Sequence, residues 1–230
     1  MAMKLASTFV VGAAFLARTI SASAAEVHAR VPGYLAVLGG AGPTLGTLDA
    51  FTQQTAASPH NSASRPFDAS GVVAMRAGWW MQGSPWGVGV EGSRVTLGTN
   101  GGAVTAWTLG GLMFVRPPSS ESWRIFPYAG LGASLYALNA EADYRPNTAG
   151  SLSTVEADWP TGPWTFDARL GLQARTAPRL VLLAEARLTH FAMDRSWTPA
   201  TWFGPPWNYR AGIKTDAVPI LFQAGAALEF

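Results

Sequence analysis

The sequence has no cysteine, few charged residues and, after its first residues, no long apolar run. The absence of cysteine excludes disulfides, zinc–cysteine sites and cysteine nucleophiles. Charged residues make up 13% of the chain, about half the usual share of ~25%. Hydrophobic residues make up 48%, yet no later run approaches the ~20 residues that a membrane-spanning helix needs. In such a chain, apolar and polar residues have to alternate along strands, so that the apolar side chains gather on one face.

The N-terminus has the three parts of a secretory signal peptide. Lys4 provides the positive start, and residues 5–16 form the apolar core. Residues 22–24 (Ala-Ser-Ala) fit an A-x-A cleavage site, with the cut after Ala24 or Ala25. An N-terminal membrane anchor is the alternative, but this apolar run is too short to span a bilayer. We therefore predict an exported protein.

Export divides the chain into a signal peptide, residues 1–25, and one domain, residues 26–230. Removal of Lys4 and Arg18 leaves 14 of the 16 basic residues, equal to the 14 acidic ones. The mature chain is then formally neutral, so the sequence pI of 9.2 does not indicate a nucleic-acid partner.

Period-two alternation recurs in eight segments of about ten residues, separated by turn residues, which is typical of strands. The clearest is residues 164–175, where large apolar side chains share one face and polar ones the other. The expected strands are residues 32–41, 72–82, 86–94, 103–116, 124–138, 164–175, 180–191 and 217–230.

The connections between these segments alternate between long and short. Bacterial outer-membrane barrels have short periplasmic turns and longer outer loops, so the pattern predicts an even strand number with both chain ends in the periplasm. Near Arg94 the alternation slips, which suggests a β-bulge or the edge of the membrane band. The long connections are residues 42–70, 139–163 and 194–212, the short ones residues 83–85, 117–121 and 176–179, and residues 98–102 form a short outer turn.

Charged residues fall on one face of four segments, and apolar residues on the other. This suits a membrane barrel, which is apolar outside, although a soluble barrel with the opposite facing gives the same alternation. The low charge and the tryptophans near strand ends favour the membrane. We predict that these charges pair in a narrow lumen, the alternative being that they line a water pathway. The six are Arg76, Glu91, Asp167, Arg169, Glu185 and Arg187.

The last segment, residues 217–230, alternates strictly and ends on Phe230. This resembles the C-terminal signal of outer-membrane barrels, which the barrel-insertion machinery recognises. The resemblance makes that machinery a partner and assigns the assembly signal to Phe222, Leu228 and Phe230.

Two further segments extend the resemblance. Residues 127–132 (PYAGLG) look like the glycine-rich strand opening of OmpA-, OmpX- and OmpW-like proteins, and residues 183–188 (LAEARL) resemble their penultimate strand. The resemblance implies an all-β fold, a transmembrane antiparallel up-and-down barrel of eight strands. It also implies a place in the bacterial outer membrane, in contact with its lipid and lipopolysaccharide.

Some eight-stranded barrels are lipid A deacylases or acyltransferases, so an enzyme is an alternative. The deacylases resemble one another in a late His-x-Ser arrangement, in which His activates Ser. Here His190 is followed two residues later by Ala192, so the nucleophile is missing. The other histidines, His28 and His60, give no metal-ligand spacing. We expect no enzyme, no metal and no cofactor.

Aromatic residues gather in the last long connection. They form either an adhesive or hydrophobic-ligand surface or part of the aromatic girdle at the membrane interface. They are Trp197, Trp202, Phe203, Trp207 and Tyr209.

The expected function is therefore that of a non-enzymatic surface protein with a structural or adhesive role. An OmpW-like narrow channel for small hydrophobic molecules is the alternative, and a lipid-modifying enzyme comes third.

Overall fold

The computed structural model describes residues 33–53, 61–100, 102–117, 124–144, 153–159, 164–197 and 210–230. Among these residues no helix is long and apolar enough to cross a membrane. The signal peptide, His28, His60 and four of the five clustered aromatic residues lie outside the described residues. Those four are Trp202, Phe203, Trp207 and Tyr209.

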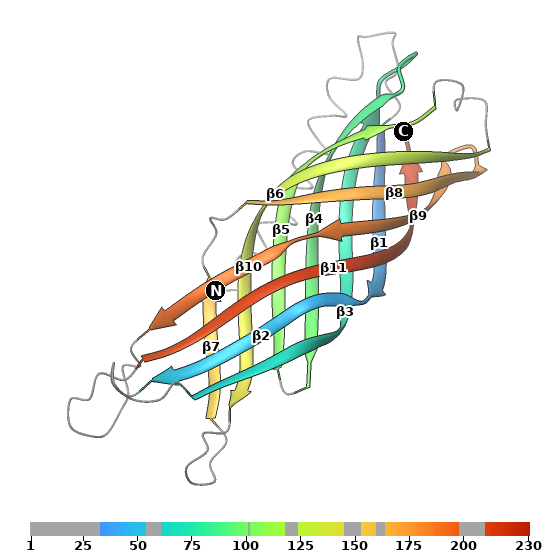
Figure 1. Cartoon of the computed structure of the whole chain (residues 1–230). Helices are drawn as coiled ribbons and strands as arrows, with labels where there is room; N and C mark the ends of the chain where they lie inside the picture. The colour runs from blue at the N-terminus through green and yellow to red at the C-terminus, as the bar shows by residue number, and fades with distance from the viewer. Residues whose placement is uncertain are drawn as a thin grey trace.

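The described residues form eleven strands in one antiparallel sheet (Figure 1). Eight of them form a ring in the order β1-β3-β4-β5-β6-β8-β9-β11, and β11 pairs with β1 to close it. This ring confirms the predicted fold class. The strands are β1 (Gly33–Gly42), β2 (Thr44–Gln53), β3 (Asn61–Trp80), β4 (Trp86–Thr99), β5 (Gly102–Val115), β6 (Ile125–Tyr144), β7 (Ser153–Trp159), β8 (Trp164–Ala177), β9 (Leu180–Thr189), β10 (Phe191–Trp197) and β11 (Arg210–Glu229).

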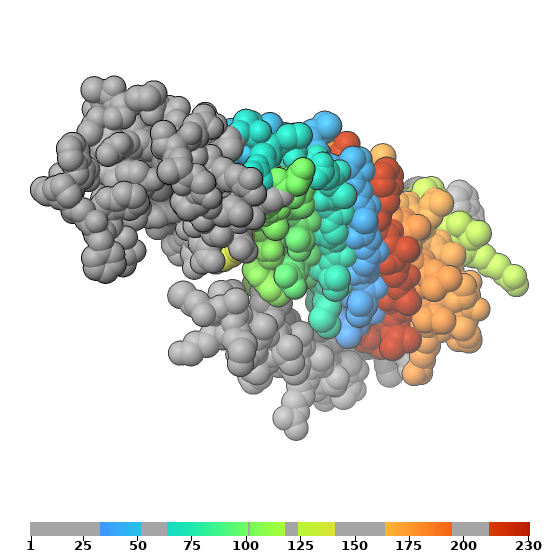
Figure 2. Space-filling view, turned by 90° about the horizontal axis from the view of Figure 1, so that it is seen from below, coloured from blue at the N-terminus to red at the C-terminus, as the bar shows by residue number. Residues whose placement is uncertain are grey.

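The two ends of the barrel differ. At one end, here called the turn end, lie the connections after β3, β5 and β8 and the closure of the ring, where the Phe230 amide donates to the Gly33 carbonyl at 2.9 Å. The opposite end is called the loop end. Figure 2 shows part of the wall in space-filling form, with β1 in blue between β3 and β11 in red.

The strands are longer at the loop end than the sequence pattern predicts. Much of what was expected to be loop is strand: β2 continues β1 beyond Pro43, β10 continues β9 beyond His190, and β3, β6 and β11 each have 20 residues. A membrane needs only ~9–11 residues per strand. The expectation that residues 42–70, 139–163 and 194–212 are loop was therefore wrong for the parts of them that form strands, and their remaining parts include residues outside the described ones.

The polarity of the wall reverses along β4, and this explains the apparent slip near Arg94. Glu91 and Ser93 point inward, and so do Val95 and Leu97 further along. The register with β3 and β5 runs unbroken through this stretch, and the irregularity in the β3–β4 ladder lies at Phe67–Ala69. The bulge interpretation at Arg94 was therefore wrong. The alternation is continuous, and apolar residues change from the outer to the inner face.

The outer face marks the same boundary. The Arg94 guanidinium lies 5.4 Å from the centre of the Trp107 ring on the neighbouring strand, an arrangement typical of a membrane interface. Towards the turn end the outer face is apolar, with Leu131 63% and Leu170 69% exposed. Towards the loop end it carries Lys214 and other exposed charged residues.

Candidate functional site

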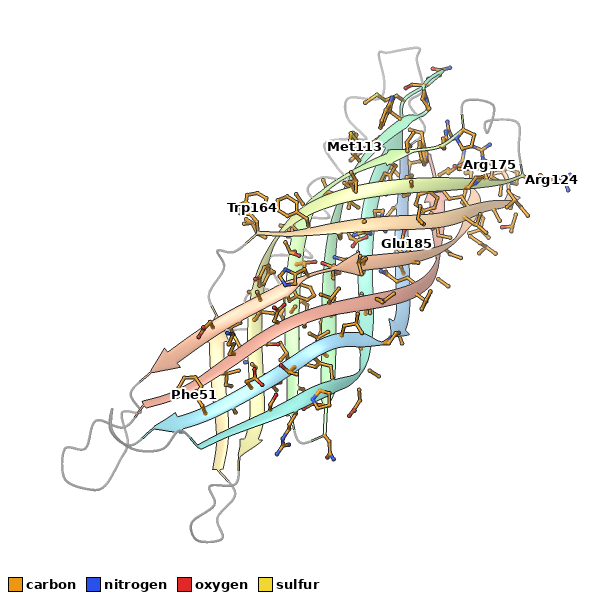
Figure 3. The ribbon with its side chains drawn as sticks, in the orientation of Figure 1. Phe51, Met113, Arg124, Trp164, Arg175 and Glu185 are labelled. Carbon is orange, nitrogen blue, oxygen red and sulfur yellow. The ribbon has the colours of Figure 1, made fainter. Side chains whose placement is uncertain are left out.

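The interior near the turn end contains an ionic cluster. All six charged side chains that the sequence assigns to the inner face lie in this region and are joined by ion pairs (Figure 3 labels Glu185). Arg76 Nη2 lies 2.8 Å from Glu91 Oε2 and 2.6 Å from Glu185 Oε1. Arg169 and Arg187 reach Glu91 at 2.6 and 3.0 Å. The cluster comprises Arg76, Glu91, Asp167, Arg169, Glu185 and Arg187.

Charge balance allows this cluster to be buried. Three arginines face three carboxylates, and none of the six residues is more than 4% exposed. Buried charges are tolerated when each is paired and hydrogen-bonded, and the Tyr128 hydroxyl adds a bond to Glu185 at 2.5 Å. Glycine on β6 leaves the necessary room, since a Cβ on Gly132 would lie 2.5 Å from Asp167 Oδ2. The cluster blocks the lumen and disfavours a water pathway along its whole length.

Aromatic rings close the lumen below this cluster, at the turn end. The Arg116 guanidinium lies 4.5 Å from the centre of the Trp80 ring, which meets Phe126 edge-on at 6.4 Å. Trp80, Phe126 and Arg116 are all nearly inaccessible to solvent. The turn end is therefore closed by two layers of buried side chains, one of aromatic rings with Arg116 and one of ion pairs.

The interior near the loop end is apolar. Its buried side chains come from β2 through β6 and from β10 and β11, and at its centre Tyr136 and Phe191 meet edge-on at 5.4 Å. This apolar interior comprises Leu48, Ala50, Phe67, Val72, Val95, Leu97, Val104, Ala106, Tyr136, Leu138, Ala140, Phe191, Met193, Ile213, Ala217 and Leu221.

The wall around the apolar interior splits on one side. β8 pairs with β9 as far as Asp167 and Thr189. Beyond that point β7 pairs with β6, β10 pairs with β11, and no ladder joins β7 to β10 among the described residues. In Figure 1 these two strands lie on different layers of the wall. We call this break the β7–β10 gap.

Side chains satisfy the backbone where the gap begins. The Thr165 hydroxyl donates to the His190 carbonyl at 2.5 Å, and the Tyr136 hydroxyl donates to the Ala192 carbonyl at 2.7 Å. Buried carbonyls need such partners. These hydroxyls therefore provide the hydrogen bonds to the backbone that a neighbouring strand provides elsewhere in the ring.

The outer border of the gap is partly apolar and partly polar. On β8, Trp164 and Phe166 are 63% and 71% exposed. On the other side His190, at the break between β9 and β10, lies 2.7 Å from Asp216 and is exposed. The gap therefore begins where the apolar band, the apolar part of the outer face near the turn end, meets the more polar outer face near the loop end.

The remaining predicted residues are placed as follows. Phe222, Leu228 and Phe230 lie on the outer face, each 60–62% exposed. Trp197 is the last residue of β10. Among the described residues, no group of three or more His, Asp or Glu side chains could hold a metal ion.

Sequence reasoning missed the apolar interior, Tyr136 and Thr165. Continued alternation with inward apolar residues, as in Val95 and Leu97, could have revealed the interior. The side-chain caps of the gap had no sequence signal, because they depend on which strands pair.

Comparisons with known proteins identify the fold. No family model and no curated protein matches the sequence. Among solved structures, the outer membrane protein OprG from Pseudomonas aeruginosa superposes with a TM-score of 0.55 at 13% identity, covering 86% of this chain and 96% of that one. The outer membrane protein AlkL, solved in lipid bilayers, gives a TM-score of 0.50 at 12% identity, covering 90% and 94%. The fold is that of the small eight-stranded outer-membrane barrels.

Proposed function

We propose that this protein lies in the bacterial outer membrane and transfers small apolar molecules from outside into the membrane, leaving the barrel sideways. The turn end faces the periplasm, since outer-membrane barrels have their short turns there. The loop half then stands outside, among lipopolysaccharide. One observation carries the proposal: among the described residues no ladder joins β7 to β10, so the hydrogen-bonded wall is interrupted beside an apolar interior, at the edge of the apolar band.

The closed turn end supports a sideways exit. An apolar molecule that continued towards the periplasm would have to separate buried ion pairs such as Arg76–Glu91, and an uncompensated buried charge costs several kcal/mol. The proposed exit instead lies beside Trp164 and Phe166, which are 63% and 71% exposed on the apolar outer face. The sideways route spares such a molecule the separation of buried ion pairs.

The protein acts without catalysis in this proposal. His190 contacts Asp216, and Ala192 occupies the place of a serine nucleophile. Export would remove residues 1–25, and the insertion machinery would recognise the last strand. A surface or adhesive role is the alternative if transfer fails. The structure adds no support for it, because most of the aromatic residues on which it rests lie outside the described residues.

A reversible bridge across the gap tests the route. The variant carries Asp158→Cys on β7 and Asp194→Cys on β10, in a chain with no other cysteine. Cells that display it take up a radiolabelled long-chain alkane before and after treatment with a reducible bismaleimide. We expect bridging to abolish most of the uptake and reduction to restore it.

The matched control bridges paired strands. Thr96→Cys and Thr105→Cys occupy partner positions on β4 and β5, so the same reagent should leave uptake unchanged there. Uptake equal to that of cells lacking the protein, bridged or not, would overturn the transfer function and leave the surface role.

A further inference from the structure

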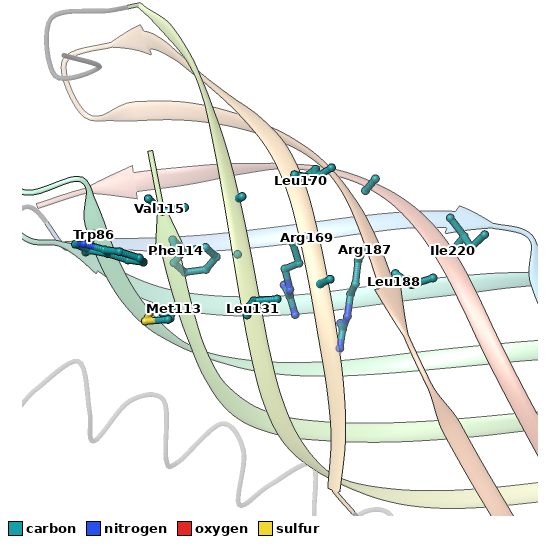
Figure 4. Close-up of a pocket in the computed structure, with 14 residues that line it drawn as sticks. Trp86, Met113, Phe114, Val115, Leu131, Arg169, Leu170, Arg187, Leu188 and Ile220 are labelled. Atoms are coloured by element: carbon teal, nitrogen blue, oxygen red, sulfur yellow. The ribbon is translucent and has the colours of Figure 1, made fainter. Parts of the chain in front are cut away.

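A hollow lies on the outer face of the wall near the turn end (Figure 4). Its volume is about 590 Å³, and a second hollow of about 450 Å³ adjoins it, sharing Leu170 and Ala186. The pairing register explains its shape. Ala129 is the partner of Leu170, which is the partner of Ala186, and in the next row Leu131, Ala168 and Leu188 alternate in the opposite order.

This arrangement makes a corrugated apolar surface within the membrane band. The alanines form the floor, and the leucines stand beside them with 46–69% of their surface exposed. An acyl chain seated between leucines contacts protein on several sides, and such dispersion contacts add up. A flat lipid-facing wall offers fewer of them.

Three arginines lie at the turn end of the strands that carry the hollow. Arg124 immediately precedes β6, Arg175 is in β8, and Arg179 is in the β8–β9 turn. The Arg175 amide donates to the Arg124 carbonyl at 2.8 Å, and Figure 3 shows both side chains at this end. Arg124 and Arg179 are exposed, while Arg175 is held by Glu229 at 3.9 Å and by the Phe126 ring.

The spacing between hollow and arginines suits one lipid leaflet. Leu170 precedes Arg175 by five residues, which is about 17 Å along a strand. Half of the ~30 Å hydrocarbon core is ~15 Å. A lipid whose phosphate meets the arginines therefore has an acyl chain long enough to enter the hollow.

We propose that this face binds one anionic glycerophospholipid of the periplasmic leaflet. Its phosphate lies between Arg124 and Arg179, and one acyl chain fills the hollow. Guanidinium groups bind phosphate oxygens through paired, charge-assisted hydrogen bonds. An anionic lipid such as phosphatidylglycerol is favoured over zwitterionic phosphatidylcholine, because its net charge is not neutralised within the headgroup.

Native mass spectrometry of the purified full barrel tests the headgroup site. Dioleoyl phosphatidylglycerol is titrated against dioleoyl phosphatidylcholine, and the fraction of protein carrying one lipid is measured. We expect tighter binding of phosphatidylglycerol. Arg124→Gln with Arg179→Gln should weaken it about fivefold per arginine, which corresponds to the ~1 kcal/mol that a basic residue contributes at an anionic lipid surface.

Matched variants separate the two parts of the site. Arg94→Gln with Lys214→Gln removes two cations near the loop end and should change nothing. Ala186→Phe fills the hollow and should weaken both lipids, whereas Ala41→Phe, on the outer face of β1, should weaken neither. All of these substitutions are on the outer face or the rim, so heat-modifiable electrophoretic mobility should report folded protein for each.

Three outcomes would overturn the proposal. Equal binding of the two lipids, unaffected by the arginine changes, would remove the headgroup site. Unchanged binding in Ala186→Phe would remove the acyl-chain site. Displacement by millimolar glycerol phosphate would show that the arginines bind a free phosphate and not a lipid.

Discussion

At the scale of single residues, Glu91 is the centre of the ionic cluster. Its carboxylate meets Arg76, Arg169 and Arg187, whereas Asp167 contacts Arg169 closely and Arg187 at 3.8 Å. Removal of either acid leaves one excess positive charge, but removal of the more connected acid deprives more arginines of a partner, and this difference can be measured.

Glu91→Gln should reduce the free energy of unfolding by about 3–5 kcal/mol, the usual cost of breaking a buried ion pair. Asp167→Asn should cost less, because fewer arginines lose a partner. Reversible urea unfolding in lipid vesicles compares the two. A larger loss in Asp167→Asn would mean that Glu91 is not the centre.

A glycine tests how tightly the lumen is packed. A Cβ on Gly171 would lie 2.6 Å from the Tyr128 ring, whose hydroxyl bonds to Glu185, whereas a Cβ on Gly111 would meet nothing within 4 Å. Gly171→Ala should therefore cost about 1–3 kcal/mol of unfolding free energy, the range for overpacking a core.

Gly111→Ala is the control for the same vesicle assay and should be nearly neutral. Similar stabilities of the two variants would show that the lumen has room beside Tyr128.

At the scale of the strands, the reversal of polarity along β4 defines where the membrane ends. Val90 and Thr96 lie on the same outer face, six residues apart and on opposite sides of Arg94. Val90 lies in the apolar band and Thr96 lies beyond it. Substitutions at these two positions of one strand therefore provide a test of the membrane boundary and its control.

Val90→Arg should cost about 2–4 kcal/mol of unfolding free energy if the site is deep in hydrocarbon, and Thr96→Arg close to zero. Unfolding in vesicles again gives both values. Equal costs would place the membrane boundary elsewhere, and a cost confined to Thr96→Arg would reverse the assignment.

Sequence reasoning succeeded where the pattern is local. In residues 164–175, the alternation identified Leu170 as outward and Arg169 as inward, because side chains in a strand alternate strictly. Sequence reasoning did not predict the strands β2, β7 and β10, because it expected apolar residues to point outward along the whole barrel. The β7–β10 gap was out of reach because it depends on pairing between distant segments.

At the scale of the whole molecule, the last strand closes the ring and carries the outward Phe230. Its side chain is 62% exposed, so it packs little against the protein. We therefore expect deletion of Phe230 to lower outer-membrane yield in cells far more than it lowers refolding into detergent.

Phe166→Ala, on β8 and 71% exposed, lies outside the assembly signal, so it is the control and should lower both yields alike. Burial of a phenylalanine is worth at most about 1.5–3 kcal/mol, which limits any stability effect of either change. Equal losses in both assays for the Phe230 deletion would assign it a structural role instead of one in recognition.

The reversed polarity of the loop half has a consequence for assembly kinetics. In the proposed orientation, this half must carry Asp49, Lys214, Asp216 and its other outward polar side chains through hydrocarbon before its apolar interior can close. Translocation of that half is then the slow step of spontaneous insertion. Thinner bilayers should speed insertion more for this protein than for a barrel whose wall ends at the membrane surface.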